Sequence, residues 1–342
     1  MVRLITMTSG KNPARRQNSN MHVLITGGAG YLGSLTAEAL LRDGYRVRVL
    51  DSLMHGGTSL LGLFGPGFSF MNGDVRDAGV VERALEGVDA VVQLAAIVGD
   101  PACARQPDLA RQTNFDSAIQ MYALTRKKGI QRLVFASTCS NYGRMADPNS
   151  YVNEDSTLAP VSLYAETKVA VEKKLLSEKP DGATSVTVLR FATLFGLSPR
   201  MRFDLTVNEF AMELMTKRKL VVFGEQFWRP YVHVRDAARS IQLVLESANG
   251  KVAGRVFNVG DSTQNYQKRG IVELVRAQIS GKVDIQSVHK QEDPRDYRVS
   301  FERIQQELGF KITATVNDGI VEILDAIDKG VFTDLSESRY RN

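Results

Sequence analysis

The sequence predicts an α/β protein with a doubly wound parallel sheet and a smaller C-terminal α/β lobe. From Met21, short β-branched runs alternate with helical stretches, and such alternation is typical of parallel strands joined by crossover helices. A glycine-rich turn directly after the first of these strands supports this. After Phe191 strands and helices no longer alternate regularly, which indicates a second, less regular part of the chain. At 342 residues the chain is long enough for two fused domains of roughly 150 residues.

The elements can be placed in order along the chain. Strands of the large sheet are expected at HVLITG, YRVRVLD, FSFMNGD, AVVQLAA, RLVFAST and SVTVLRF. After these come a loop (LSPRMR), a helix near 204–218, a strand (LVVF), a helix from about 234 and a strand (RVFNVG). In such sheets ligands bind outside the carboxyl ends of the strands.

The net charge of +5 does not indicate a nucleic-acid-binding surface. Residues 1–20 contain four basic and no acidic residues, so the balance from Met21 onward is only about +1. A nucleic-acid footprint needs a basic face on the folded body. No run approaches the roughly 18 apolar residues of a membrane span. We therefore expect neither nucleic acid nor a membrane as a partner.

The cysteines and histidines predict no metal. The two cysteines, Cys103 and Cys139, make no disulfide framework, and the four histidines show no paired ligand spacing. This composition fits a reducing cytoplasm. Each cysteine is interpreted first as a small buried apolar residue.

The segment TGGAGYLG predicts a dinucleotide site of the Rossmann type. Gly27 allows a tight turn, Gly30 lets the backbone approach a pyrophosphate, and Gly33 lets the helix pack on the strand. The helix that opens at Tyr31 and Leu32 would present free N–H groups to the phosphates. A glycine-rich βα turn without a ligand would explain the glycines alone.

Asp51, at the end of the second strand, favours the dinucleotide interpretation. A carboxylate about twenty residues past the last glycine can bind the two ribose hydroxyls. The residues directly after Asp51 are Ser52, Leu53 and Met54, so there is no arginine here to meet a 2′-phosphate. NAD is therefore preferred to NADP. Further cofactor contacts are expected from Asp74 and Val75 after the third strand, and from Leu94, Ala95 and Ala96 after the fourth.

Three residues downstream predict proton-transfer chemistry. Thr138 ends the fifth strand, and Tyr164 and Lys168 lie four apart on a predicted helix, hence on one face. An ammonium beside a phenol lowers the pKa of the phenol toward that of a working base. A Tyr-x-x-x-Lys pair alone is weak evidence for catalysis. It becomes stronger evidence here because it follows a dinucleotide motif in the same chain.

In this order the residues resemble the extended short-chain dehydrogenase/reductase superfamily, specifically the NAD-dependent epimerase/dehydratase family of nucleotide sugars, over about residues 21–330. The resemblance implies that Tyr164 is the catalytic base, that Lys168 binds the nicotinamide ribose and tunes Tyr164, and that Thr138 positions the sugar oxygen. It also implies a homodimer formed through helices near 107–128 and 161–178.

Residues after Thr138 depart from the pattern of the 4,6-dehydratases in this family. Those enzymes carry an Asp-Glu pair there, whereas this chain has Cys139 and Ser140. Elimination of water needs that additional acid and base, so dehydratase activity is disfavoured. Cys139 and Ser140 are instead expected to contact the substrate.

The resemblance points to further substrate contacts. The family's Arg-Tyr-Phe-Asn stretch appears as RFAT from Arg190, without its asparagine. A replacement is expected from the loop 198–208, where Arg200, Arg202 and the amide of Asn208 could meet a diphosphate. The alternative interpretation is a solvated basic loop. Arg229 and Arg298 match arginines that the family directs at the nucleotide, and the planar guanidinium suits phosphate oxygens.

These interpretations combine into one prediction of organisation and function. The chain is divided into a disordered tail (1–20), a NAD-binding domain (21–190), a mainly substrate-binding domain (191–330) and a polar tail (331–342), with a boundary that the chain may cross more than once. The expected activity is that of a NAD-dependent epimerase of nucleotide-diphosphate sugars. The alternatives are a ketoreductase of 4-keto-6-deoxysugar nucleotides, a threonine dehydrogenase-like enzyme, and a non-catalytic NAD-binding sensor or scaffold.

Overall fold

The structure is a computed structural model that describes residues 21–145, 147, 150–177, 184–289 and 295–342. The expected disordered tail, residues 1–20, lies outside this part. The main sheet has seven parallel strands in the order β10-β6-β5-β4-β1-β2-β3. They are β1 (His22–Thr26), β2 (Arg46–Asp51), β3 (Phe68–Asn72), β4 (Ala90–Gln93), β5 (Arg132–Thr138), β6 (Ser185–Phe191) and β10 (Arg255–Val259). This confirms the doubly wound α/β fold.

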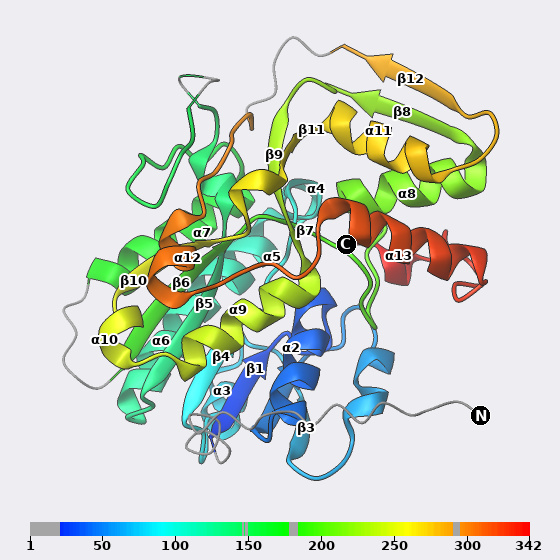
Figure 1. Ribbon diagram of the computed structural model, residues 1–342. Coiled ribbons are helices and arrows are strands. Elements are labelled where there is room, and N and C mark those ends of the chain that lie inside the picture. The colour runs from blue at the N-terminus through cyan, green and yellow to red at the C-terminus, as the bar shows by residue number, and fades with distance from the viewer. Residues whose placement is uncertain (1–20, 146, 148–149, 178–183, 290–294) are drawn as a thin grey trace, which may run out of the picture.

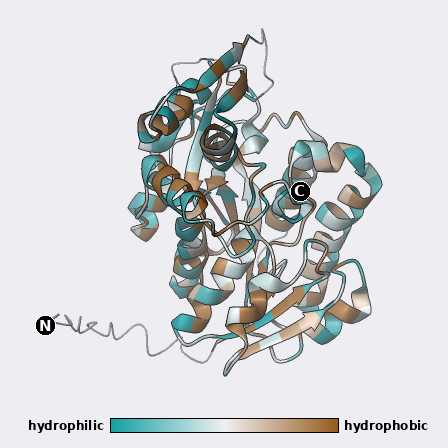
Figure 2. Ribbon diagram, turned by 90° about the vertical axis from the view of Figure 1, so that its right-hand side faces the viewer, coloured by the Kyte–Doolittle hydropathy of each residue, from teal (hydrophilic) through white to brown (hydrophobic). Residues whose placement is uncertain are grey.

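Helices cover both faces of this sheet (Figure 1). One face carries α2 (Tyr31–Arg42) and α9 (Val234–Glu246), and the other carries α3 (Ala78–Ala84), α6 (Ser117–Lys127) and α7 (Leu163–Ser177). Because both faces are covered, the central strands are apolar throughout rather than alternating, and β1 is buried at every position. The brown strands in the interior of Figure 2 show this.

The helix expected near 107–128 is continuous but not uniform. It comprises α5 (Pro107–Arg111), a wider π-helical turn (Gln112–Asp116) and α6, and is preceded by the short α4 (Asp100–Arg105). Such π turns are frequent at functional sites. Here the turn contains Asn114, whose side chain donates to and accepts from the backbone of Ile97, so it fixes the loop that follows β4.

A second lobe lies beyond the carboxyl ends of the strands (Figure 1). It contains a sheet of β7 (Thr193–Phe195), β9 (Trp228–His233) and β11 (Asn265–Gln267), and a pair of β8 (Lys219–Phe223) and β12 (Asp284–Val288). Its helices are α8 (Thr206–Lys217), α11 (Lys268–Gln278) and α13 (Val316–Asp328). Their apolar faces form a separate core around Phe210, Ile271 and Ile320.

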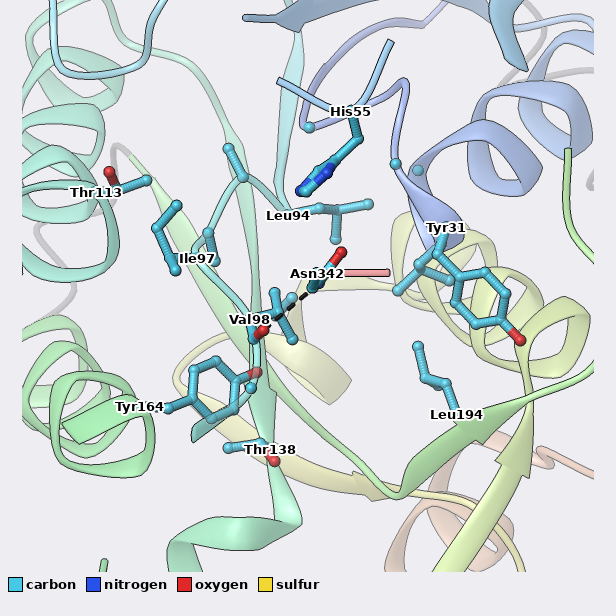
Figure 3. A pocket seen from close by; sticks show the side chains of 18 of the residues that line it. Tyr31, His55, Leu94, Ile97, Val98, Thr113, Thr138, Tyr164, Leu194 and Asn342 are labelled. Carbon is cyan, nitrogen blue, oxygen red and sulfur yellow. Dashed lines mark hydrogen bonds between the residues drawn. The ribbon is translucent and has the colours of Figure 1, made fainter. Parts of the chain in front are cut away.

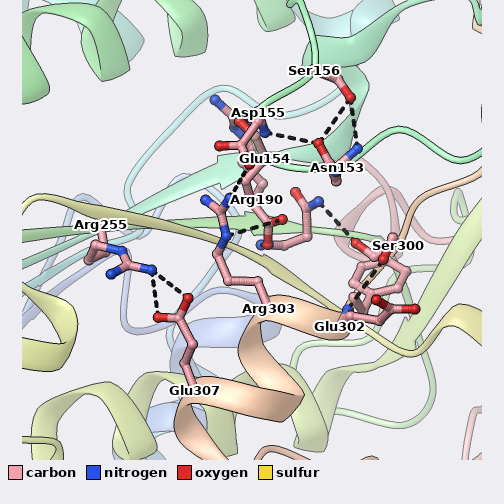
Figure 4. Close-up of polar contacts among 12 residues, drawn as sticks. Asn153, Glu154, Asp155, Ser156, Arg190, Arg255, Ser300, Glu302, Arg303 and Glu307 are labelled. Carbon is pink, nitrogen blue, oxygen red and sulfur yellow. Dashed lines mark hydrogen bonds and ion pairs between the residues drawn. The ribbon is translucent and has the colours of Figure 1, made fainter.

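The chain returns from the second lobe to complete the first. After α9 and the short α10 (Asn249–Val252), β10 pairs in parallel with β6, and α12 (Glu302–Leu308) packs on β10. Two ion pairs hold the returning segment of β10 and α12 in place (Figure 4). Arg255 pairs with Glu307 and Arg303 pairs with Asp155, each at 2.5 Å. Segments on both sides of residue 190 therefore build the large sheet.

Residues 331–342, expected as a loose polar tail, are instead anchored to the second lobe at a few positions, although none of these residues is fully buried. The rings of Phe332 and Tyr340 contact that of Phe203, with centroids 5.1 and 5.7 Å apart. The backbone N–H of Phe203 donates to the carbonyl of Tyr340 at 2.9 Å. Aromatic residues dispersed in a polar segment thus provide enough contact area to hold it, and the C-terminal residue lies near the centre of the molecule (Figure 1).

Across the described residues, every helix is too short or too polar to cross a bilayer. The same part of the chain gathers no group of three or more His, Cys, Asp or Glu side chains suited to a metal ion. Both cysteines are buried thiols.

Candidate active site

A cavity of about 360 Å³ opens at the carboxyl edge of the large sheet, between the two lobes. The glycine turn, the ends of β2, β4 and β5, the start of α7 and the loop after β7 all contribute to its wall. Figure 3 shows its length: Tyr164 and Thr138 lie toward one end, His55 toward the other, and Asn342 between them. Residues distant in the sequence therefore meet in one elongated space, the shape that a dinucleotide needs.

The glycine turn is built so that only glycine fits at two of its positions. Gly27 has a φ of +74°, and a Cβ there would lie 2.8 Å from the backbone N of Ala95. A Cβ on Gly33 would lie 2.1 Å from the carbonyl O of Gly27. No side chain caps the first turn of α2, which begins at Tyr31, and Tyr31, Leu32 and Gly33 line the cavity. The turn thus offers open backbone donors to a diphosphate.

Asp51 is held at the cavity wall by its neighbours. Its two carboxylate oxygens accept the N–H groups of Ala29 at 3.0 Å and Leu53 at 2.8 Å. Burial raises the pKa of Asp51, and these hydrogen bonds oppose the rise. A carboxylate at the end of β2, beside the glycine turn, fits the ribose of a dinucleotide.

The other expected cofactor contacts also line the cavity, with one addition. Val75, Leu94, Ala95 and Ala96 are all part of its wall. Asp74 is there too, but its carboxylate pairs with the Arg76 guanidinium at 2.6 Å. Hydrogen bonds from Arg76 hold the pKa of Asp74 below its usual value. Sequence reasoning did not consider Arg76, which lies only two residues further on.

Thr138, Tyr164 and Lys168 converge on the cavity from β5 and α7. The Thr138 hydroxyl accepts the N–H of Ser140 at 3.1 Å, which directs it at the strand end. The Lys168 ammonium donates to the carbonyl of Ala136 at 2.7 Å and lies 6.0 Å from the centre of the Tyr164 ring. Backbone contacts of this kind fix both side chains before any ligand is present.

The expected lowering of the Tyr164 pKa by Lys168 is not found. Burial is the largest influence on the Tyr164 phenol and raises its pKa. Burial also lowers the pKa of Lys168 to about 8. The ammonium donates to the Ala136 carbonyl and lies closer to the Phe135 ring, at 4.7 Å, than to the Tyr164 ring, at 6.0 Å.

The two residues after Thr138 differ in orientation, and the expectation for Cys139 is corrected. Its thiol is buried behind the cavity wall and donates to the carbonyl of Arg190 at 3.3 Å, and burial raises its pKa well above the ordinary value. Ser140 does line the cavity, and its hydroxyl accepts from that of Tyr297 at 3.4 Å. Only Ser140 is placed to contact a ligand.

The expectation for Asn208 is also corrected, because this residue lies in the first turns of a helix and is fully buried. Its amide donates to the Tyr31 hydroxyl at 3.1 Å and to the carbonyl of Arg202 at 2.8 Å. Its oxygen accepts the N–H of Gly196 at 3.0 Å. Asn208 therefore joins the second lobe to α2 and is not part of the cavity wall.

Arg229 and Arg298 do not belong to the described cavity wall either, which corrects a further expectation. Arg229 is buried over the Tyr297 ring at 5.6 Å and donates to the carbonyl of Trp228. Arg298 lies 5.0 Å from the Trp228 ring. In this structure both pack against aromatic side chains that support the wall.

Other arginines line the cavity in place of Arg229 and Arg298. Arg200 and Arg202, from the loop after β7, and Arg295 line it. Arg202 pairs with Asp204 at 2.6 Å and Arg295 with Asp100 at 2.7 Å. Arg200 and Arg202 belong to a loop whose positive charge the sequence does show. No local signal singled out Arg295, since it reaches Asp100 across 195 residues.

The sequence did not predict two further residues of the cavity wall, His55 and Asn342. His55 lines the wall, and burial together with Arg200 lowers its pKa to about 4. Asn342 lies inside the cavity, where its amide reaches the carbonyl of Val98 at 3.5 Å (Figure 3). Neither residue belongs to a motif.

Comparison with known proteins agrees with this geometry. The model of the NAD dependent epimerase/dehydratase family matches residues 23–260. The chain is 29% identical to a UDP-glucose 4-epimerase of Corynebacterium glutamicum, over 88% of this chain and 94% of that protein. It is 30% identical to a dTDP-glucose 4,6-dehydratase of Streptomyces griseus, over 87% of this chain and 92% of that protein.

Solved structures show the same architecture. A dTDP-glucose 4,6-dehydratase of Streptomyces venezuelae with NAD bound superposes with a TM-score of 0.81 at 26% identity, covering 91% of this chain and 98% of that one. A UDP-glucose 4-epimerase of Thermus thermophilus in complex with NAD gives a TM-score of 0.77 at 26% identity, covering 90% and 99%.

The fold and its glycine turn define a dinucleotide-binding α/β enzyme. The chain belongs to the NAD dependent epimerase/dehydratase family, whose model covers more than half of it. The family resemblance and NAD as the cofactor are thereby confirmed. Epimerases and dehydratases are equally similar to the chain, so the comparisons do not support the expectation that disfavoured a dehydratase.

Proposed function

We propose that the protein is a NAD-dependent epimerase of a nucleotide-diphosphate sugar. The observation that carries the proposal is the meeting of Thr138, Tyr164 and Lys168 at one end of a cavity whose other parts fit a dinucleotide. The names of relatives add support, since several are UDP-glucose 4-epimerases. The nucleotide sugar is proposed as substrate on the same grounds.

NAD, when bound, supplies a hydride acceptor and a positive charge at this end of the cavity. In the proposed reaction Tyr164 takes the proton from a sugar hydroxyl, while Thr138 holds the same oxygen by a hydrogen bond. The raised pKa of Tyr164 means that the phenol keeps its proton in the ligand-free protein. It becomes a base only when positive charge is brought close, which restricts proton removal to the assembled complex.

The residues after Thr138 favour epimerisation over loss of water. Dehydration requires an acid and a base beyond the tyrosine, and the Cys139 thiol is buried and held by the Arg190 carbonyl. Ser140 offers a hydroxyl but no carboxylate. Asp100, a wall carboxylate whose charge acts on Tyr164, is paired with Arg295. These contacts support transfer of hydride without elimination.

The test is turnover of UDP- and dTDP-sugars by the purified protein without added cofactor, followed by NMR of the sugar. Epimerisation predicts an inverted centre, and Tyr164→Phe should abolish it while NAD binding persists. A 4-keto-6-deoxysugar product would establish a dehydratase, and stoichiometric use of NADH on a keto sugar would establish a ketoreductase. Unchanged turnover in Tyr164→Phe would contradict the assigned base.

We also propose the homodimer implied by the resemblance, formed through α6 and α7, which lie side by side on one face of the sheet. Sedimentation of the purified protein tests it. A mass of about twice 37.8 kDa is expected, and a monomer at micromolar concentration would contradict the dimer.

A further inference from the structure

Arg200 is a buried arginine that has no carboxylate as a hydrogen-bond partner in the described part of the chain. It lies in the loop after β7 and lines the cavity, yet the residue is only 6% exposed. Its Nη2 donates to the carbonyl of Arg341 at 2.9 Å. Its Nε is buried and finds no acceptor among the residues that the structure describes. A buried guanidinium with an unused donor is costly unless a ligand completes its contacts.

Its surroundings are suited to an anion. Burial, and after it the nearby charge of Arg202, lower the pKa of Arg200 to about 10. Arg202 is neutralised by Asp204, at 2.6 Å. Among the described residues, the direct hydrogen-bond partner of Arg200 is the neutral carbonyl of Arg341. The positive charge of Arg200 thus faces the cavity that the first turn of α2 enters from the opposite lobe.

Arg200 lies toward the end of the cavity that is expected to hold the cofactor. The charge of Arg200 acts on Asp51, the expected ribose ligand, and on His55. The charge of Arg202 reaches both ends, since it acts on His55 and on Tyr164. The loop of Arg200 also touches the first turn of α2 directly, because the Ser198 hydroxyl donates to the carbonyl of Tyr31 at 2.7 Å. These contacts place Arg200 beside the diphosphate path of the dinucleotide.

Residues 341–342 occupy the space next to Arg200. The Arg341 carbonyl receives its hydrogen bond, and the Asn342 side chain lies in the middle of the cavity (Figure 3). The Asn342 carbonyl accepts from Arg105 at 3.1 Å, and its amide reaches Val98. A neutral carbonyl is a weaker partner for a guanidinium than a phosphate oxygen, so this contact is replaceable.

We propose that Arg200 binds the diphosphate of NAD from the second lobe, and that the backbone of residues 341–342 takes the place of that diphosphate in the free protein. The contact fastens the second lobe to the cofactor, complementing the glycine turn of the first. The inference rests on NAD binding and is independent of which sugar reaction follows.

Equilibrium binding of three probes to purified apoprotein tests the proposal: NAD, ADP and adenosine. Arg200→Gln should weaken NAD and ADP by about ten- to hundredfold, the effect of losing one hydrogen-bonded charge, and should change adenosine less than twofold. Arg200→Lys, which keeps the charge but not the planar fork, should lie between. Arg269→Gln, which removes an exposed arginine of α11, is the matched control and should bind all three normally.

Removal of residues 341–342 is a second experiment. It should tighten ADP binding when Arg200 is intact and should have no effect on ADP binding when it is combined with Arg200→Gln. Two results would overturn the proposal: unchanged NAD and ADP affinities in an Arg200→Gln protein that melts normally, or an equal loss of affinity for ADP and adenosine in that protein. None of these measurements needs turnover, so failure of the epimerase assignment would leave them interpretable.

Discussion

Arg190 and Glu172 form a buried ion pair, 2.6 Å between Nη2 and Oε2, directly beneath the strand end that carries Thr138. Glu172 also accepts from the amide of Asn141 at 2.8 Å and from the Ser137 hydroxyl. The guanidinium lies over the Tyr142 ring at 5.3 Å. The pair thus links α7, β6 and the end of β5, which are the elements that bring the three expected catalytic residues together.

Glu172→Gln should destabilise the protein by about 3 kcal/mol, because loss of one partner leaves a buried charge uncompensated. Urea unfolding followed by circular dichroism measures this. Replacing both residues, as in Glu172→Leu with Arg190→Met, should recover part of the loss. A loss below about 1 kcal/mol in Glu172→Gln would show that the pair is not the main support of the strand end.

Lys168 should make stability depend on pH. Because burial lowers its folded pKa to about 8 from 10.5, the unfolded chain binds more protons between these values, and stability rises with pH in that window. The unfolding free energy of the wild type should therefore increase relative to Lys168→Met from pH 8 to pH 10, by about 2 kcal/mol. Urea titrations at four pH values measure it. Parallel profiles for both proteins would contradict the buried ammonium.

Gly33→Ala should cost about 2 kcal/mol or more and weaken NAD binding, because the new methyl would meet the Gly27 carbonyl at 2.1 Å. Gly62→Ala is the control, since a Cβ at Gly62 meets nothing within 4 Å. Thermal denaturation with and without NAD compares the two. Equal melting temperatures would mean that the glycine turn tolerates a side chain.

Asn208→Ala should act on stability rather than on substrate affinity. Three hydrogen bonds to Tyr31, Arg202 and Gly196 are lost, with an expected cost of about 2 kcal/mol. The KM for the sugar nucleotide should stay within about twofold at a temperature where the variant is folded. A tenfold rise in KM without loss of stability would restore Asn208 as a substrate ligand.

The large sheet could be predicted from the sequence because its strands are buried on both faces and appear as continuous apolar runs. β7 and β11, with three residues each, are too short to carry a period and were missed. The glycine turn, Asp51 and the Thr138, Tyr164 and Lys168 set are local or regularly spaced signals. They were placed on the cavity for that reason.

Contacts that depend on the second lobe could not be ranked from one sequence. Asn208 falls in the helix expected near 204–218, but only tertiary structure shows that it lies on the buried side of this helix. Arg200, Arg295 and Asn342 reach the cavity from separate segments, whereas Arg229 and Arg298 pack on aromatic rings instead. Charge alone does not distinguish these arginines, because their direction is set by strands and loops far away in the chain.

The pairing of β10 with β6 has a consequence for the growing polypeptide. While the ribosome is still adding residues up to 254, β6 is an open edge with unpaired backbone groups, and such edges recruit other chains. A gene fragment that stops near residue 190 should therefore yield insoluble protein even though it encodes the whole glycine turn. Split versions of this enzyme need to keep β10 with the first part of the chain, or supply it as a separate strand.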